Sequence, residues 1–412
     1  MKQHPYYTRV WVLKRHVQGP LAPHLEPFAA FLERRGYSYN SGQRFIREVG
    51  RLSRWAAARR IKAEDLSEAI VKNYLRFRFK GLGSKVKRGP YDRLLDYLRQ
   101  VGVISRAPVT QQSSLSQCLR PYLDHLIYNQ GLEKETIRRL IRGARCFLSH
   151  RFGNGAIEFS ELHSQDIVRY LLVRSQQCGP STLGLEASAL RSFLRFLQFQ
   201  GAVPSRLVKS VPTMRRWRQK SVPTFLKQGE TSLLIQRCDI QTPKGRRDLA
   251  ILLLLVRLGL RAKEVCRLSL DDIDWRGGYI IVHGKNGKCN RLPLLDEVGR
   301  AIGAYLCNSR PRCSIRHIFL RSVAPFDAFS SSSAVSHVVR SALARASLNP
   351  TPKGSHLLRH SLATHMLQEG ASLADIGQIL RHQRLDTTAI YAKVGMGQLR
   401  PIAPPWPKGG AS

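Results

Sequence analysis

A histidine and an arginine near the C-terminal end have a spacing that could do chemistry. His356 and Arg359 stand three residues apart in the stretch HLLRH, which has the apolar periodicity of a helix. Positions three apart share one helix face, whereas Leu358, Leu362 and Met366 mark a different, apolar face. We therefore predict that the imidazole and the guanidinium point together toward a polar partner.

Four other residues could join them, although each has an ordinary structural explanation when it is considered alone. Arg261 follows a glycine break after a hydrophobic run, and burial of its charge would require an anionic partner, for which Glu264 is one turn away. Lys285 directly precedes an Asn-Gly pair, which predicts a hairpin tip. His382 and Tyr391 are separated by RLDTT, which predicts a turn and a helix start. A functional interpretation therefore depends on the whole set.

The elements expected around these residues are mainly helical, with a small antiparallel sheet. RRDLAILLLLVRLGL predicts a buried helix that breaks at Gly259, and a second short helix follows. GGYIIVHGKNGKCNRLPL predicts a β-hairpin. SHLLRHSLATHMLQEG predicts a helix with Ser355 as its N-cap and Gly370 as its C-cap, and SLADIGQIL opens with an S-x-x-D capping pattern.

The composition favours a polyanionic partner. The 412 residues include 67 Lys and Arg against 28 Asp and Glu, a formal net charge of +39, and nucleic acid is the usual polyanion. The longest apolar run, Ala250–Val256, is too short to span a bilayer, and the N-terminus lacks the apolar core of a signal peptide. Eight scattered cysteines without a C-x-x-C pair favour reduced thiols in a cytoplasmic protein.

Two segments in the N-terminal half resemble each other. The sequence FLERRGYSYNSGQRFIREVGRLSRW parallels LIYNQGLEKETIRRLIRGARCFLSH, with Gly36 matching Gly131 and Arg44 matching Arg139. Further matches follow in the same order, so we predict two small homologous all-helical domains, the alternative being chance similarity between Arg-rich helices.

The chain is accordingly predicted to have five parts. These are an N-terminal helical domain (1–105), a second helical domain (115–205), a basic linker (206–222), a mixed domain (223–395) and a C-terminal tail (396–412). The linker could follow a phosphate backbone or be a solvated loop. The predicted DNA contacts are the linker residues Arg215, Arg216, Arg218 and Lys220, together with Arg139 and Arg142.

The stretch from about residue 223 to 394 resembles the catalytic domain of the tyrosine recombinases. That family carries Arg, a hairpin Lys, H-x-x-R, His or Trp, and Tyr in this chain order. One departure is Arg381, where the family usually has Gly. The helical segment from Leu119 to about Val203 resembles the family's core-binding domain, and the N-terminal segment is an extra copy. The matching residues here are Arg261, Lys285, His356, Arg359, His382 and Tyr391.

The resemblance implies roles for these residues. Tyr391 would attack a DNA phosphodiester and form a 3′-phosphotyrosine, while the two arginines of the set hold the phosphate oxygens. The two histidines would add hydrogen bonds, His356 could accept the tyrosine proton, and Lys285 would protonate the leaving 5′-oxygen. No cofactor or metal is expected, since no phosphate-binding loop or H-E-x-x-H pair is present and His360 and His365 should face different ways.

The implied partners are double-stranded DNA with specific recombination sites, a homo-tetramer on that DNA, and accessory DNA-bending proteins or sister recombinases. A mobile-element integrase in bacterial cytoplasm, associated with the nucleoid, is the preferred biological role, with no membrane partner. The tail could dock on a neighbouring protomer through Leu399, Ile402 and Trp406. The alternatives are a type IB topoisomerase-like enzyme, a catalytically silent DNA-binding relative, and a metal-dependent transposase, for which no carboxylate cluster stands out.

Overall fold

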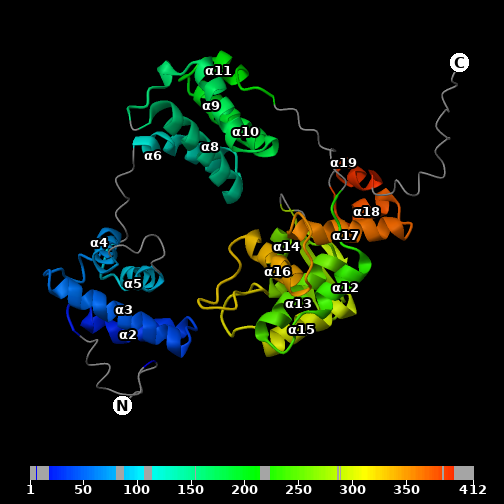
Figure 1. The fold of residues 1–412 in the computed structure, drawn as a ribbon, viewed down its shortest axis with the longest axis horizontal. Helices are drawn as coiled ribbons and strands as arrows, with labels where there is room; N and C mark the ends of the chain where they lie inside the picture. The colour runs from blue at the N-terminus through cyan, green and yellow to red at the C-terminus, as the bar shows by residue number, and fades with distance from the viewer. Residues whose placement is uncertain are drawn as a thin grey trace. The chain divides into compact units, whose positions relative to one another are not determined.

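The computed structural model describes residues 18–79, 88–105, 114–153, 155–213, 223–284, 289–382 and 385–393, together with Tyr6 and Gly287. The chain divides into two compact units: Met1–Ile104 with Ser221–Ser412, and Ser105–Lys220. The predicted fold class, mainly helical with a small antiparallel sheet, is confirmed (Figure 1). None of the described helices is long and apolar enough to cross a bilayer.

In the N-terminal part of the first unit, the described residues form four helices around a core of their own. They are α2 (Ala22–Arg34), α3 (Tyr39–Ala57), α4 (Glu68–Arg78) and α5 (Gly89–Gln100). A polar network ties three of these helices together. Glu48 of α3 pairs with the Arg78 guanidinium of α4 and accepts a 2.7 Å hydrogen bond from the Tyr91 hydroxyl of α5.

The second unit is a separate helical bundle. Its elements are α6 (Ser114–Cys118), α7 (Arg120–Asp124), the π-helical η1 (His125–Asn129), α8 (Lys134–Phe152), the 3-10 turn η2 (Phe159–Glu161), α9 (Ser164–Gln177), α10 (Pro180–Phe199) and α11 (Ser205–Lys209). The short helix α11 occupies the start of the predicted linker. Leu207 of α11 and Val211, which follows the end of that helix, are buried in the core of this bundle.

The two helical segments repeat local features at the matched positions. Helices α3 and α8 have 19 residues each. Gly36 and Gly131 both have positive φ, at 76° and 57°, and so do Gly102 and Gly201, at 76° and 72°. Glycine adopts this conformation at low energetic cost, so each pair marks an equivalent chain reversal. These features support a duplication, while the domain boundaries stay predictions.

The C-terminal part of the first unit contains the helices and the sheet that carry the proposed catalytic residues. The three-stranded sheet has the order β1 (Ile273–Asp274), β2 (Tyr279–His283), β3 (Cys289–Pro293). The helical elements are α12 (Gln228–Gln236), α13 (Pro243–Arg257), α14 (Ala262–Arg267), η3 (Leu270–Asp272), α15 (Asp296–Asn308), α16 (Ser332–Arg345), α17 (Ser355–Gln368), α18 (Leu373–Ile379), α19 (Leu385–Thr388) and η5 (Ala389–Lys393).

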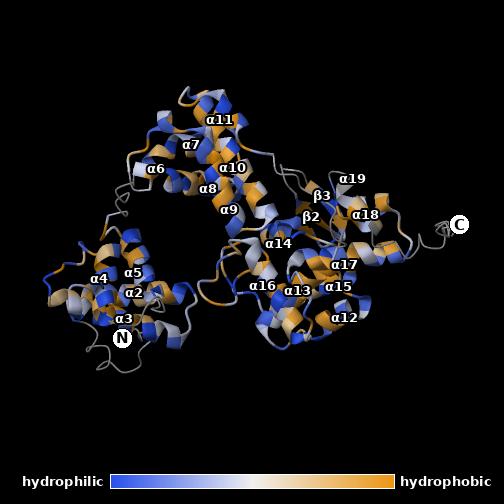
Figure 2. Ribbon diagram, turned by 45° about the horizontal axis from the view of Figure 1, so that its top comes forward, coloured by the Kyte–Doolittle hydropathy of each residue, from blue (hydrophilic) through white to orange (hydrophobic). Residues whose placement is uncertain are grey.

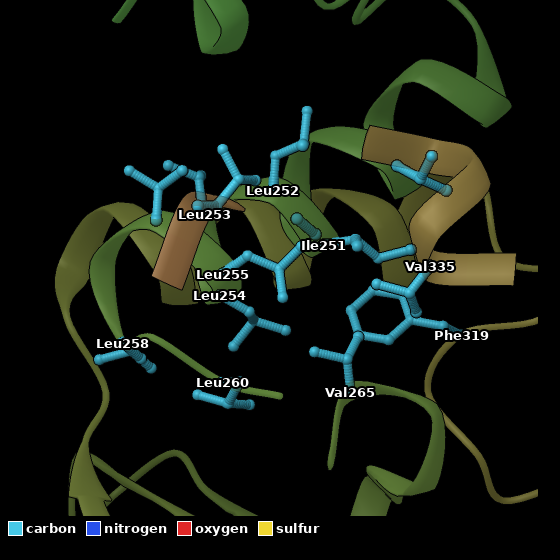
Figure 3. Close-up of a cluster of buried hydrophobic side chains, with 14 of the residues drawn as sticks. Ile251, Leu252, Leu253, Leu254, Leu255, Leu258, Leu260, Val265, Phe319 and Val335 are labelled. Atoms are coloured by element: carbon cyan, nitrogen blue, oxygen red, sulfur yellow. The ribbon is translucent and has the colours of Figure 1, made fainter. Parts of the chain in front are cut away.

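Helix α13 is the centre of this core, as the apolar run predicts. Every side chain from Ala250 to Val256 is buried, and Figure 3 shows the leucines of α13 together with Phe319 and Val335 of other segments. In the hydropathy colouring, hydrophobic and hydrophilic residues follow one another along each helix, as expected for helices with one buried face (Figure 2). The predicted break at Gly259 is confirmed by its φ of 57°.

The predicted hairpin is confirmed, with β2 and β3 antiparallel from Tyr279↔Pro293 to His283↔Cys289. The capping box at the start of α18 is also confirmed, since the Ser372 hydroxyl accepts from the Asp375 backbone N–H at 3.1 Å. The two predicted caps of α17 were each wrong by one position, because the C-cap is Glu369 and Gly370 follows it. Gly354, with extended backbone, is the N-cap, and Ser355 is the first helical residue.

Candidate active site

Arg359 is a buried residue that connects the C-terminal ends of two helices, α13 and α18. It lies on α17 with 3% of its surface exposed, and its two terminal nitrogens donate to the carbonyl oxygens of Gly259 and Leu380. Burial, followed by the charges of Arg261 and Arg381, lowers its pKa to about 10, so it remains a cation at neutral pH. Both hydrogen bonds are to neutral carbonyls, so the positive charge still favours an anion.

Arg261 has the anionic partner that the sequence predicts. It is the N-cap of α14, its Nη1 donates to Glu264 Oε1 at 2.8 Å, and its backbone N–H donates to Oε2 at 2.8 Å. Burial alone raises the pKa of Glu264, but the hydrogen bonds from Arg261 and the charge of Arg381 outweigh it and hold that pKa below its usual range. The Arg261 side chain is 38% exposed, so a ligand can reach its guanidinium.

Arg381 is built into the same ion-pair cluster. Its side chain is only 6% exposed, and its Nη2 donates to Glu264 Oε2 at 3.1 Å. Its backbone has φ of 53°, a conformation that glycine adopts readily and an arginine does not. The left-handed backbone explains why glycine suits this position, and the ion pair with Glu264 offsets the strain of an arginine there.

Tyr391 is buried beside two histidines. The residue is 1% exposed, and its hydroxyl lies 2.8 Å from Nδ1 of His360. The ring of His382 is nearly parallel to the tyrosine ring, with centroids 6.4 Å apart. Burial raises the pKa of Tyr391 to about 12 against the lowering charge of Arg359, so the phenol is protonated at neutral pH.

His360 is a member of the site that the sequence reasoning missed. Burial, then the neighbouring His356 and Arg359, lowers its pKa to about 4, so the ring is neutral, and in its Nε2–H tautomer Nδ1 accepts the hydrogen bond from the Tyr391 hydroxyl. The available signal was its place one helical turn after His356. His365, five residues further along α17, lies outside this cluster. Its Nε2–H donates to the Leu226 carbonyl at 2.8 Å.

The two histidines of the predicted set lie in different surroundings. His382 Nδ1 is 2.8 Å from Thr388 Oγ1, and burial followed by Arg359 and Arg261 lowers its pKa to about 4. His356 is exposed at the start of α17, although desolvation of its ring and then the same two arginines lower its pKa. The prediction that His356 and Arg359 share one polar face was therefore incomplete, because Arg359 is buried.

Several predicted site residues cannot be placed in this cluster. Lys285, the linker residues Arg215, Arg216, Arg218 and Lys220, and the tail residues Leu399, Ile402 and Trp406 lie outside the described residues. Arg139 and Arg142 lie on α8, where they line a hollow of about 330 Å³ with Glu135, Thr136 and Arg138. In the part of the chain that the structure describes, no three His, Cys, Asp or Glu side chains are grouped as metal ligands.

The side chains around Tyr391 are suited to nucleophilic attack on an anionic group. Arg261 and Arg359 supply cationic donors suited to an anionic transition state, and Tyr391 supplies a hydroxyl hydrogen-bonded to a neutral imidazole. A hydroxyl nucleophile, an adjacent base and charge-stabilising donors are the three components of covalent nucleophilic catalysis.

Comparison with known proteins matches this region to a family. The model of the Phage integrase family matches residues 224–397. The chain is 37% identical over 401 residues to a protein of Sinorhizobium fredii described as "Putative integrase/recombinase y4rA", covering 96% of this chain and 97% of the relative. It is 29% identical to the tyrosine recombinase XerC of Bacillus subtilis, over 68% of this chain and 92% of XerC.

A solved structure shares the fold. A lambda integrase tetramer bound to a Holliday junction has a TM-score of 0.52 at 16% identity, over 76% of this chain and 88% of that one. The relative that matches nearly the full length of the chain shows the family, and the solved structure shows the fold. The chain therefore belongs to the tyrosine recombinase (phage integrase) family of enzymes, which cleave and rejoin DNA.

Proposed function

We propose that this protein is a site-specific recombinase that cleaves DNA through a 3′-phosphotyrosine on Tyr391. The observation that carries the proposal is the 2.8 Å contact between the Tyr391 hydroxyl and His360, made within the field of Arg359. Attack of the phenolate oxygen on phosphorus would form the protein–DNA bond and release a 5′-hydroxyl. A 5′-hydroxyl of a second duplex would then displace the tyrosine, which exchanges strands without net loss of a phosphodiester.

The two arginines are proposed to hold the phosphate. The transition state gathers negative charge on the non-bridging oxygens, and guanidinium groups offer paired donors to them. Arg261 is partly exposed and shares Glu264 with Arg381, so it can turn toward DNA while the carboxylate keeps one cationic partner. Arg359 is already held rigidly by two carbonyl groups and contributes a fixed positive charge.

The tyrosine proton must leave before or during attack. In the free protein the phenol has a pKa of about 12, and it donates to a ring whose pKa of about 4 keeps it neutral. We therefore assign the role of proton acceptor to His360, in place of the His356 that the sequence suggests. Lys285 stays the proposed general acid for the leaving oxygen, on the resemblance of its motif.

The proposed substrate is double-stranded DNA at specific sites, and the proposed setting is a mobile element in bacterial cytoplasm. The net charge of +39 supports the polyanionic partner. The relative in Sinorhizobium fredii bears the name of an integrase/recombinase, and the lambda integrase with the same fold was solved as a tetramer on a Holliday junction. A tetramer on DNA is accordingly proposed here.

A suicide-substrate assay tests the proposal. A nicked duplex from the ends of the element that carries the gene is incubated with wild type or Tyr391→Phe in the presence of EDTA. The expected result is a covalent adduct at the 3′-phosphate that only the wild type forms. An adduct that persists in Tyr391→Phe would overturn the assignment of the nucleophile. Relaxation of supercoiled DNA without strand exchange would favour a topoisomerase instead.

A further inference from the structure

Cys289 and His283 of the hairpin and Asp272 at the end of η3 form a hydrogen-bonded chain. Cys289 and His283 are cross-strand partners at the last pair of β2 and β3. The Cys289 Sγ lies 3.3 Å from Nδ1 of His283, and Nε2 of the same ring lies 2.7 Å from Oδ1 of Asp272. The thiol has a second, longer contact of 3.7 Å to the Gly287 carbonyl.

The three groups are connected in the sequence thiol, imidazole, carboxylate, which is the arrangement that activates a nucleophile. Nε2–H donates to Asp272, so Nδ1 carries the lone pair that faces the thiol. Asp272 is 7% exposed, and its other oxygen accepts the backbone N–H of Ser269 at 2.7 Å, which fixes the carboxylate. A nucleophile, a base within hydrogen-bond reach and a third group that orients the base are the general requirements for nucleophilic activation.

The geometry argues against a metal site at the same place. The thiol and the carboxylate approach opposite nitrogens of one imidazole ring, so the three groups form a line and do not converge on a point. Within the described residues no metal-like cluster includes them. The linear arrangement leaves Nδ1 of His283 facing the thiol, and Cys289 is exposed to solvent, where a small reagent can reach it.

We propose that Cys289 is a reactive thiol, activated by His283 and oriented by Asp272, and that it is a site of reversible oxidation by hydroperoxides. The thiol proton passes to Nδ1 of His283, and the thiolate attacks one peroxide oxygen. The S–O bond forms as the O–O bond breaks, and the leaving hydroxide takes the proton from His283 to become water. Sulfur loses two electrons and becomes a sulfenic acid, while the peroxide gains them.

The position of this thiol gives the oxidation a consequence for the reaction. In the sequence, Lys285 lies two residues after His283 and four before Cys289. A sulfenic acid or a mixed disulfide at Cys289 adds bulk and polarity at the start of β3, four residues from Lys285 in the sequence. Slower DNA cleavage by the oxidised protein is therefore expected, and this consequence rests on the proposed function of Lys285.

The chain carries its own controls for thiol reactivity. Cys307 and Cys313 are also exposed, and neither has a histidine within hydrogen-bond distance among the described residues. Cys266 is 7% exposed, and burial raises its pKa to about 11, so it should react only when the protein unfolds. Peptide-level mass spectrometry separates the four sites in a single sample.

The test treats the full-length protein, without DNA, with hydrogen peroxide and dimedone, which traps sulfenic acids. Cys289 is expected to be labelled about tenfold faster than Cys307 and Cys313, because an ordinary thiol is only a few per cent thiolate at neutral pH. His283→Gln is expected to reduce the rate at Cys289 to that of the two controls, and Asp272→Asn to reduce it in part. Labelling of Cys266 would identify any variant that has unfolded.

Two results would overturn the proposal: equal labelling of Cys289 and the exposed controls in wild type, or an unchanged Cys289 rate in a folded His283→Gln. If His283→Gln proves unfolded, the wild-type comparison still decides, together with His283→Asn. The same labelling in Tyr391→Phe should match wild type. Because the measurement needs neither DNA nor cleavage, a failure of the proposed recombination would leave its outcome unchanged.

Discussion

The hydroxyl of Tyr391 lies 2.8 Å from Nδ1 of His360, a contact between residues 31 positions apart. Burial is the main cause of both pKa shifts: it raises the pKa of the Tyr391 phenol to about 12 and lowers the pKa of the His360 imidazole to about 4. The pair is therefore a neutral phenol on a neutral imidazole. In the proposed reaction, this balance has to change before the proton can move from the phenol to the imidazole.

His360→Asn is expected to slow single-turnover cleavage about 100-fold, because general-base catalysis contributes factors of that order. The measurement is adduct formation on a suicide substrate under single-turnover conditions. His365→Asn is the matched control on the same helix, since His365 contacts the Leu226 carbonyl and not the tyrosine. Equal effects of the two substitutions would show that His360 acts only through the fold.

Stability is expected to fall as the pH decreases from 6.5 toward about 4. His360 and His382 have pKa values of about 4 in the folded protein, against 6.5 ordinarily, so in this interval the unfolded state binds more protons. Protonation of His360 should cost on the order of 2–3 kcal/mol of stability at the acidic end, and His382, which is only half buried, should cost less because solvent screens its charge. Urea unfolding across this interval measures the slope, and the double substitution His360→Asn with His382→Asn should flatten it. If the double variant keeps the same dependence of unfolding free energy on pH, other titratable groups must cause it.

Arg381→Gly removes both the strained left-handed backbone of an arginine and its positive charge, and the two changes should affect different measurements. Glycine relieves about 1 kcal/mol of strain at φ of 53°, but it also leaves Glu264 with Arg261 as its partner. Arg261 is then held more tightly by the carboxylate, so we expect cleavage to slow several-fold while the urea midpoint changes little. Arg381→Lys keeps the charge and should retain most of the rate. Faster cleavage by Arg381→Gly would contradict this account.

Glu264→Gln is expected to destabilise the protein by about 3 kcal/mol, because it leaves the buried guanidinium of Arg381 without its anionic partner. Equilibrium urea unfolding provides the value. Glu297→Gln is the control, since its ion pair with Arg257 is exposed on both sides and should contribute less than about 1 kcal/mol. Similar losses in both variants would show that burial of the Glu264 cluster has no special effect.

Gly259→Ala is expected to be strongly destabilising. The residue has φ of 57°, and an added Cβ would lie 2.6 Å from a methyl carbon of Leu380 and 3.0 Å from one of Leu362. Strain and overpacking together should lower the unfolding free energy by about 2–4 kcal/mol. Gly303→Ala, in the interior of α15 with nothing within 4 Å of the new Cβ, should stabilise slightly. A neutral Gly259→Ala would contradict the close packing described here.

The local chemistry of the sequence was sufficient for several elements. The β-branched, apolar stretch YIIVH followed by an Asn-Gly pair predicts the hairpin of β2 and β3. The glycine after the leucine run predicts the end of α13, and the S-x-x-D pattern predicts the start of α18. Each of these depends on turn geometry or capping among residues a few positions apart. The order of the catalytic residue types, by resemblance, likewise required no tertiary information.

The tertiary structure decided which side chains meet. Arg261 and Arg381 are 120 residues apart, and no local pattern predicts that they share Glu264 or that Arg381 is buried with a left-handed backbone. The same holds for the choice of His360 over His356 beside Tyr391, because both lie one turn apart on α17 and only the packing of η5 distinguishes them. Periodicity shows which face of a helix is apolar, but which polar partner lies opposite depends on contacts between elements far apart in the chain.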